Sequence, residues 1–217
     1  MERNGNPPDC QDQIASAGPY EEFKPTLAIS VVWTVLATVM TVAGFILFAL
    51  VHTQVGGTLG GDGSLVEYGS DNDTLYFSLR LGGMVALLAV VIGALLVHEA
   101  IHGLGFWYFG GRPTFGATIV QKILPVLYCS APGYQFSRAQ FSVIILAPLV
   151  VISLVGILLM PFVNNGMLLV TPLAVNFGGA IGDVWMFGMI LRRKSGTMIE
   201  DLKDGLRFHP PEARRAG

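Results

Sequence analysis

The sequence is poor in charge. Only 13% of its 217 residues are Asp, Glu, Lys or Arg, whereas soluble proteins carry about 25%. Hydrophobic residues make up 52% of the chain, and the mean hydropathy is +0.59. This balance argues against an ordinary soluble domain. It indicates an integral membrane protein that lies in a lipid bilayer, and we expect no nucleic acid as a partner.

Cysteine is scarce, and a secretory signal is absent from the first 26 residues. The two cysteines, Cys10 and Cys129, lie far apart and show no metal-site spacing, so we predict two free thiols. The first 26 residues are rich in Pro, Asn, Asp and Gln and lack the basic and apolar regions of a secretory signal. We therefore predict no cleaved signal, so that the first apolar span itself directs insertion.

Basic residues are missing from two of the loops between apolar stretches. Segments 52–77 and 164–170 contain no Lys or Arg, and Arg80 is the only one of the 13 basic residues at that end of the predicted spans. Cytoplasmic loops are the ones enriched in Lys and Arg. Both termini and the loop at 110–140 are therefore predicted to face the cytoplasm of a multi-pass cell-membrane protein.

The predicted fold is an all-α polytopic membrane protein with four transmembrane helices and a short β-hairpin-like insertion between spans two and three. Segment 26–194 would form this four-span domain, between a polar cytoplasmic tail at 1–25 and a charged cytoplasmic tail at 195–217. After residue 110, Gly and Pro end the helix, and TFGATIVQ and LPVLYCS are typical of strands. Such a hairpin could bind an extended substrate by strand addition, or it could be a simple surface loop.

Three further local predictions concern the loops and the last two spans. The Gly-rich segment 52–77 forms either a second short hairpin or a loose loop. Pro148 would kink the third span or mark its inner end. Thr171 and Pro172 are a typical helix cap and first-turn pair, which predicts that the fourth span starts there.

The second predicted span carries a motif with ionisable side chains. His98, Glu99 and His102 spell H-E-x-x-H within an otherwise uncharged apolar stretch. At about 100° per residue, the two histidines share one helix face and can hold one zinc ion, while Glu99 lies about a quarter turn away. Ionisable groups inside a membrane span are costly unless they are paired or bound to metal. The motif therefore predicts a Zn²⁺ site, with hydrogen bonding to neighbouring helices as the alternative.

Catalytic zinc usually takes three protein ligands, so a third one is needed. Asp183 is the only charged residue between Ala139 and Leu191 and lies nine residues before Arg192, as His102 lies ten before Arg112. Both therefore lie at a similar depth, about 14 to 15 Å from the inner helix ends, which predicts Asp183 as the third ligand.

Two features near Asp183 extend this prediction. Asn176 lies two turns before Asp183 on the same face and is predicted to donate to the developing oxyanion, or else to hydrogen-bond between helices. The spacing of Gly178 and Gly182 predicts that the fourth span packs closely against the second.

Several segments together resemble a known family. HEAIHGLGFWYFGGRPTFG, YCSAPG, the FSRAQF and LAP stretch and NFGGAIGD resemble the zincin peptidases called domain of unknown function 3267 (DUF3267), which are similar to site-2-type intramembrane metalloproteases. The resemblance covers roughly residues 75–190. It implies zinc, peptide hydrolysis, His98 and His102 as ligands and Glu99 as the catalytic base. Site-2 enzymes take a third ligand from an Asn-Pro-Asp-Gly type motif, which is absent here, where Asp183 stands in a Gly-Asp-Val context.

The resulting prediction is a zinc-dependent intramembrane peptidase that cleaves a membrane protein or peptide within the bilayer, near its cytoplasmic side. Two alternatives remain: a zinc hydrolase of a non-peptide ester or amide, and a non-enzymatic metal-binding scaffold. Glu99 argues against the scaffold because it is not needed as a ligand. The sequence identifies neither the substrate nor the oligomeric state.

Overall fold

The computed structural model describes residues 20–60, 66–71, 74–120, 124–203 and 205–211. Most of the predicted N-terminal tail, including Cys10, and the last six residues of the predicted C-terminal tail lie outside these ranges. Within them, four helical stretches are long and apolar enough to cross a membrane: Leu27–Gln54, Leu81–Tyr108, Arg138–Phe162 and Gly166–Leu191. The predicted fold class is therefore confirmed.

The helices bury little of their apolar surface inside the protein. Large side chains such as Val35, Leu88 and Leu158 are more than half exposed. An apolar surface of this extent is a liability in water but suits contact with lipid chains. This supports a multi-pass membrane protein.

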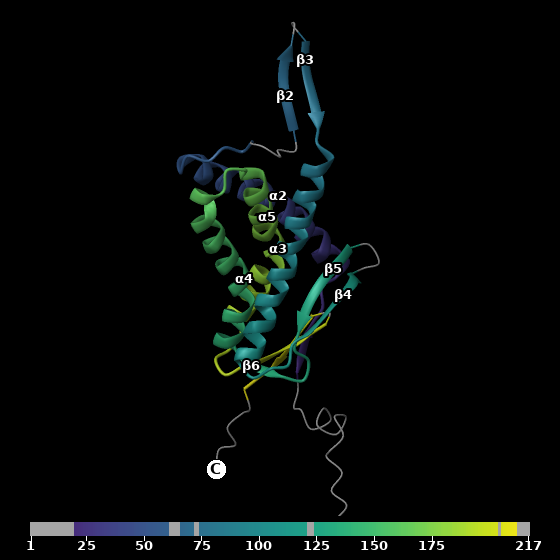
Figure 1. The fold of residues 1–217 in the computed structure, drawn as a ribbon. Coiled ribbons are helices and arrows are strands. Elements are labelled where there is room, and N and C mark those ends of the chain that lie inside the picture. The colour runs from purple at the N-terminus through teal and green to yellow at the C-terminus, as the bar shows by residue number, and fades with distance from the viewer. Residues whose placement is uncertain (1–19, 61–65, 72–73, 121–123, 204, 212–217) are drawn as a thin grey trace, which may run out of the picture.

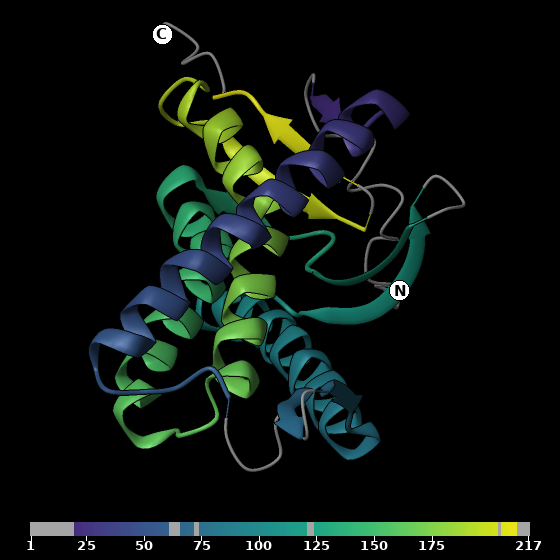
Figure 2. The same cartoon turned by 90° about the horizontal axis from the view of Figure 1, so that it is seen from above.

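The four stretches form a bundle with a hairpin at one end and a small sheet at the other (Figure 1). The first stretch is α2 (Leu27–Gln54), and it lies across the fourth stretch in the view from above (Figure 2). A Cβ added at Gly178 would collide with the Thr41 side chain and the Ala37 carbonyl of α2, whereas Gly182 faces open space. Gly178 therefore contacts the first span and not the second. The fourth stretch does pack against the second, as predicted, but through residues other than these two glycines.

The fourth stretch is two helices, not one. α5 (Gly166–Gly179) and α6 (Ile181–Leu191) are separated by Ala180 alone. The predicted start at Thr171 is wrong, because α5 begins five residues earlier and contains Pro172. The start is held by the Gly166 N–H, which donates to the Thr58 carbonyl at 2.9 Å. This contact between distant segments outweighs the local capping signal.

The third stretch begins with α4 (Arg138–Leu159), which is capped reciprocally by Ser137 and Gln140 and continues into a short 3-10 turn. Pro148 lies in the middle of α4, not at its inner end. Because proline has no N–H, the carbonyl four residues before it, that of Ile144, loses its helical partner.

Two hairpins join the spans. β4 (Thr114–Val120) and β5 (Leu124–Ser130) pair antiparallel after α3 (Leu81–Tyr108), which confirms the predicted insertion between spans two and three. At the other end of the bundle, β2 (Val66–Asp71) and β3 (Thr74–Leu79) pair antiparallel. Of the two alternatives for this segment, the hairpin is therefore the one that the structure forms.

A four-stranded antiparallel sheet closes the end of the bundle opposite β2 and β3 (Figure 1). Its order is β1 (Glu21–Phe23), β8 (Gly205–His209), β7 (Met198–Leu202) and β6 (Gln135–Ser137). It unites the two ends of the chain with the start of α4. Its buried side chains pack on those of the helix ends, and this core includes Phe106, Phe136, Phe141, Ile190, Ile199, Leu206 and Phe208. No strand is predicted from the sequence in 195–217, so this sheet was not expected.

Candidate metal centre

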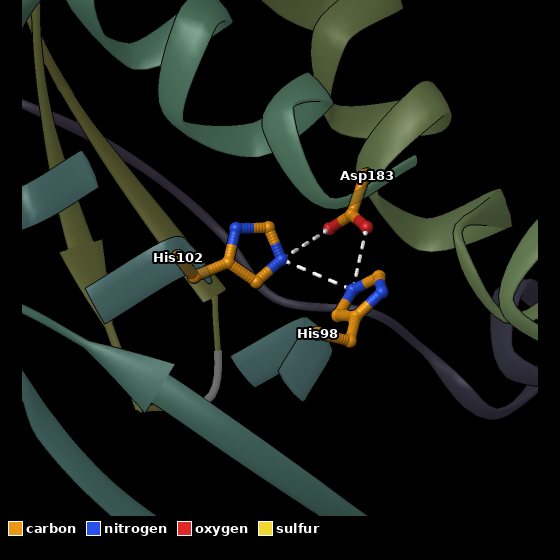
Figure 3. Close-up of side chains that lie close together, drawn as sticks. All are labelled: His98, His102 and Asp183. Atoms are coloured by element: carbon orange, nitrogen blue, oxygen red, sulfur yellow. Dashed lines mark hydrogen bonds and ion pairs between the residues drawn. The ribbon is translucent and has the colours of Figure 1, made fainter. Parts of the chain in front are cut away.

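The three predicted ligands come together from two helices. His98 and His102 lie one turn apart on α3, and Asp183 lies in the first turn of α6, just after the break at Ala180. All three side chains are buried and point toward one another (Figure 3). One possible ligand atom from each lies within 4.8 Å of the others.

The spacing of these atoms suits a tetrahedral zinc ion. The two histidine Nε2 atoms are 3.2 Å apart. Oδ2 of Asp183 lies 3.3 Å from Nε2 of His98, and Oδ1 of Asp183 lies 3.5 Å from Nε2 of His102. With bonds of about 2.0 to 2.2 Å and tetrahedral angles, ligand atoms of one zinc ion are about 3.3 to 3.5 Å apart. The three residues therefore fit zinc with a fourth position left for another ligand.

The opposite ring nitrogens also indicate a cation. Nδ1 of His98 lies 2.9 Å from Oδ1 of Asn176, and Nδ1 of His102 lies 3.1 Å from the backbone oxygen of Ile144. Both acceptors are oxygens, so each Nδ1 carries the proton in the neutral ring. The two Nε2 lone pairs then face each other and a carboxylate. That arrangement is repulsive unless a proton or a metal ion lies between them.

Asn176 contacts a ligand directly. It lies on α5, one turn before the break, and is only 2% exposed. Its oxygen accepts the hydrogen bond from His98, while its Nδ2 has no protein partner. The amide therefore holds the His98 ring and keeps a buried donor available for another group.

Glu99 is separate from the three convergent side chains. Its carboxylate accepts a hydrogen bond from the backbone N–H of Cys129 on β5. It lines the same cavity as His98, His102 and Asp183. This position, beside the centre and outside its ligand set, is the one that a base needs.

The cavity has a volume of about 900 Å³. It runs between α2 and β5 down to the four-stranded sheet, where Lys203 and Gly205 line it. On the α2 side the lining includes Thr34, Thr38 and Thr41, each of which donates to a carbonyl of its own helix at 2.8 to 2.9 Å. The centre is therefore reached through a partly polar passage.

Sequence reasoning missed one acidic side chain in this cavity. Asp201 lies on β7, is 9% exposed and accepts a hydrogen bond from the Ala131 N–H. Burial, and then the nearby Asp183 and Glu99 charges, raise the pKa of Asp201 well above its usual value. Asp201 carries no local signal, because its place in the cavity depends on the four-stranded sheet, which was not predicted.

Cys129 is a buried free thiol, as predicted. Burial, with Glu99 and Asp201 nearby, raises the pKa of its thiol to about 12. Cys129 is therefore a protonated, unreactive side chain, and it contributes to the site through its backbone N–H.

Comparison with known proteins agrees with this site. Residues 91–198 match the model of the DUF3267 family, whose description is "Putative zincin peptidase". The matched stretch contains His98, Glu99, His102, Asn176 and Asp183. No curated protein and no solved structure matches the chain.

Proposed function

Because the chain belongs to the DUF3267 family over residues 91–198, we propose that it is a zinc-dependent peptidase that cleaves a membrane protein or peptide within the bilayer, near the cytoplasmic side. The observation that carries this proposal is the mutual spacing of His98, His102 and Asp183, at 3.2 to 3.5 Å. It supports three ligands of one zinc ion with a position left for chemistry.

The surrounding residues have distinct proposed roles. When bound, zinc supplies a polarised substrate carbonyl and a water molecule of lowered pKa. Glu99 takes the proton of the attacking water and returns it to the leaving amine. Asn176 holds His98 through its oxygen and offers its unpartnered Nδ2 to the developing oxyanion.

We place the substrate along β5. The Cys129 N–H donates to Glu99 on α3, so the edge of β5 away from β4 faces the catalytic carboxylate. A peptide added to this edge would be extended, which exposes an amide that a helix would protect. The threonine-lined side of α2 would bound the peptide on its other side. This supports peptide hydrolysis over hydrolysis of a non-peptide ester or amide.

The decisive experiment compares two glutamates. Wild type, Glu99→Gln and the control Glu200→Gln, in which the buried carboxylate lies in the sheet, are purified in lipid and incubated with membrane peptides of cells that lack the protein. We expect Glu99→Gln to keep zinc and to lose cleavage by about 100- to 10,000-fold. Glu200→Gln, measured where it stays folded, should still cleave.

Two outcomes would change this proposal. If Glu99→Gln loses zinc while Asp183→Ala keeps it, Glu99 is the ligand and Asp183 the base. If cleavage by wild type and Glu99→Gln is equal, the peptidase proposal fails and the scaffold alternative takes its place.

We also propose that the β2–β3 end faces outside and the four-stranded sheet faces the cytoplasm, since basic residues gather at the sheet end. Thr53→Cys, at the exposed end of α2, should then react with an impermeant thiol reagent in sealed cells. Lys203→Cys should react only after permeabilisation. The reverse labelling pattern would invert the orientation.

A further inference from the structure

One buried carbonyl in the bundle has an unusual partner. In an α-helix the N–H of each residue donates to the carbonyl four residues earlier, and Pro148 has no N–H to give to Ile144. Ile144 is fully buried, so bulk water does not supply a donor. The donor is the Nδ1 of His102, at 3.1 Å.

We infer that Pro148 is a positioning residue for the metal centre, because it leaves the Ile144 carbonyl open to orient the His102 ring and fix its proton on Nδ1. The Nε2 of His102 is then a lone pair aimed at His98 and Asp183. This inference rests on the proposed zinc site and assigns to α4, which supplies no ligand of its own, a part in building it. Partners of this kind set the orientation and basicity of metal-binding histidines.

Close approach of α3 and α4 makes the contact possible. A Cβ added at Gly105, three residues after His102, would lie 3.2 Å from the Ile144 side chain and 3.4 Å from its Cα. The glycine thus brings the backbone of α4 next to the face of α3 that carries His102. Gly105 provides the proximity, and Pro148 provides the free acceptor.

The second histidine is held in another way, which supplies a control. His98 donates to the Asn176 side chain, so no helix carbonyl is needed. α5 also contains a buried proline, Pro172, which frees the Leu168 carbonyl. Neither imidazole uses that carbonyl, because both Nδ1 atoms have other acceptors.

Pro148→Ala should separate metal binding from stability. Alanine restores the N–H that bonds to Ile144 and competes with His102, and loss of an outer partner typically weakens metal binding by about 10- to 100-fold. At the same time alanine favours the helix, so the resistance of the bundle to unfolding should stay the same or rise. A purely structural role of Pro148 would not lower zinc affinity while stability is kept.

The test measures zinc affinity by chelator competition in lipid for wild type, Pro148→Ala and Pro172→Ala. The absorption spectrum of the cobalt form reports the ligand geometry of each. We expect Pro148→Ala alone to lose affinity, by about 10-fold or more, and to change the cobalt spectrum. Equal affinities and spectra in the two proline variants would overturn the inference while leaving the proposed function intact.

A second measurement does not depend on the variants. Nitrogen NMR of ¹⁵N-histidine-labelled wild type without metal, with His102→Gln to assign the signal, should show the neutral His102 ring protonated on Nδ1. A ring protonated on Nε2 would overturn the inference. Failure of wild type to bind zinc would instead remove the proposed function, and this inference with it.

Discussion

Two polar clusters of this protein, each containing a buried carboxylate, use similar residues to different ends. The membrane cluster consists of His98, His102 and Asp183, and the sheet cluster of Glu22, Glu200, Arg207 and His209. Each contains a histidine beside a carboxylate: His98 and Asp183 are 3.3 Å apart, and His209 and Glu200 are 3.1 Å apart. Only the sheet cluster includes a guanidinium, which lies 3.1 Å from Glu200 and 2.7 Å from Glu22.

The difference lies in where the positive charge comes from. Arg207 forms an ion pair with both carboxylates of the sheet cluster, and the Gly133 N–H adds a further donor to Glu200 at 2.9 Å. In the membrane cluster two lone pairs and a carboxylate converge, and the Nδ1 protons point away from them. A histidine beside a carboxylate therefore does not identify a metal site. A group that could hold a metal ion needs ligand atoms of several residues that converge, as in the membrane cluster.

The largest effect should come from removing a member of the membrane cluster. His98→Ala, His102→Ala or Asp183→Ala takes away a direct ligand. Loss of a residue that only hydrogen-bonds to a ligand weakens metal binding by up to about 100-fold, so zinc affinity should fall by more than that here. The matched variant His209→Ala removes a histidine that also contacts a carboxylate, and zinc affinity should not change. Metal analysis of the purified variants checks both. Zinc retained at wild-type affinity in His98→Ala/His102→Ala would refute the site.

The membrane cluster could be predicted because its signals lie within short segments or in the number of residues between each side chain and a helix end. His98 and His102 are one helical turn apart, and Asp183 is the only charged residue in the apolar segment between Ala139 and Leu191. His102 and Asp183 lie ten and nine residues before basic helix ends, which predicts a similar depth for both. The break at Ala180 was not predicted. Gly178 and Gly179 just before it weaken a helix, but Gly178 was interpreted as a residue of close helix packing.

The sheet cluster could not be predicted, for a physical reason. Its strands have three to five residues, and β1 pairs with β8 across most of the chain, Glu22 opposite Arg207. Strands this short are marginal alone and form only when a larger surface supports them. Here the helix ends supply that surface through the shared apolar core. Local sequence patterns therefore predict two polar tails in place of the sheet.

A smaller effect is expected for Glu200→Gln, on stability alone. Glu200 is 7% exposed and accepts from Gly133, Arg207 and His209. Loss of its charge weakens all three interactions, so the free energy of unfolding should fall by about 2 to 3 kcal/mol. Denaturant unfolding in mild detergent measures this. Unchanged stability, or a loss of zinc, would contradict the separation of the two clusters.

The same carboxylate predicts an acid-sensitive sheet. Burial alone would raise the pKa of Glu200, but the hydrogen bonds from Gly133 and His209 and the Arg207 charge outweigh it and hold the pKa below its ordinary 4.5. An acid with a lowered pKa stabilises the fold fully above its unfolded value and loses that contribution as the pH falls. The stability gap between wild type and Glu200→Gln should therefore be constant above about pH 5 and shrink below about pH 4.5. A gap that grows on acidification would show the opposite sign.

The smallest effect is expected for Glu21→Gln. This variant tests whether burial or hydrogen-bond geometry decides how much an ion pair contributes to the free energy of unfolding. Glu21 pairs with Arg193 through two hydrogen bonds of 2.6 and 2.9 Å, a geometry as good as any in the sheet cluster. Its side chain, however, is 65% exposed, and Arg193 also lies 4.1 Å from the centre of the Phe208 ring, which keeps it in place without Glu21. Exposed pairs contribute at most about 1 kcal/mol and are screened by salt. Glu21→Gln should therefore lower the free energy of unfolding by less than about 1 kcal/mol, by even less in high salt, and leave zinc affinity unchanged. A loss as large as that of Glu200→Gln would mean that the attachment of β1, and not burial of the carboxylate, determines the stability of the sheet.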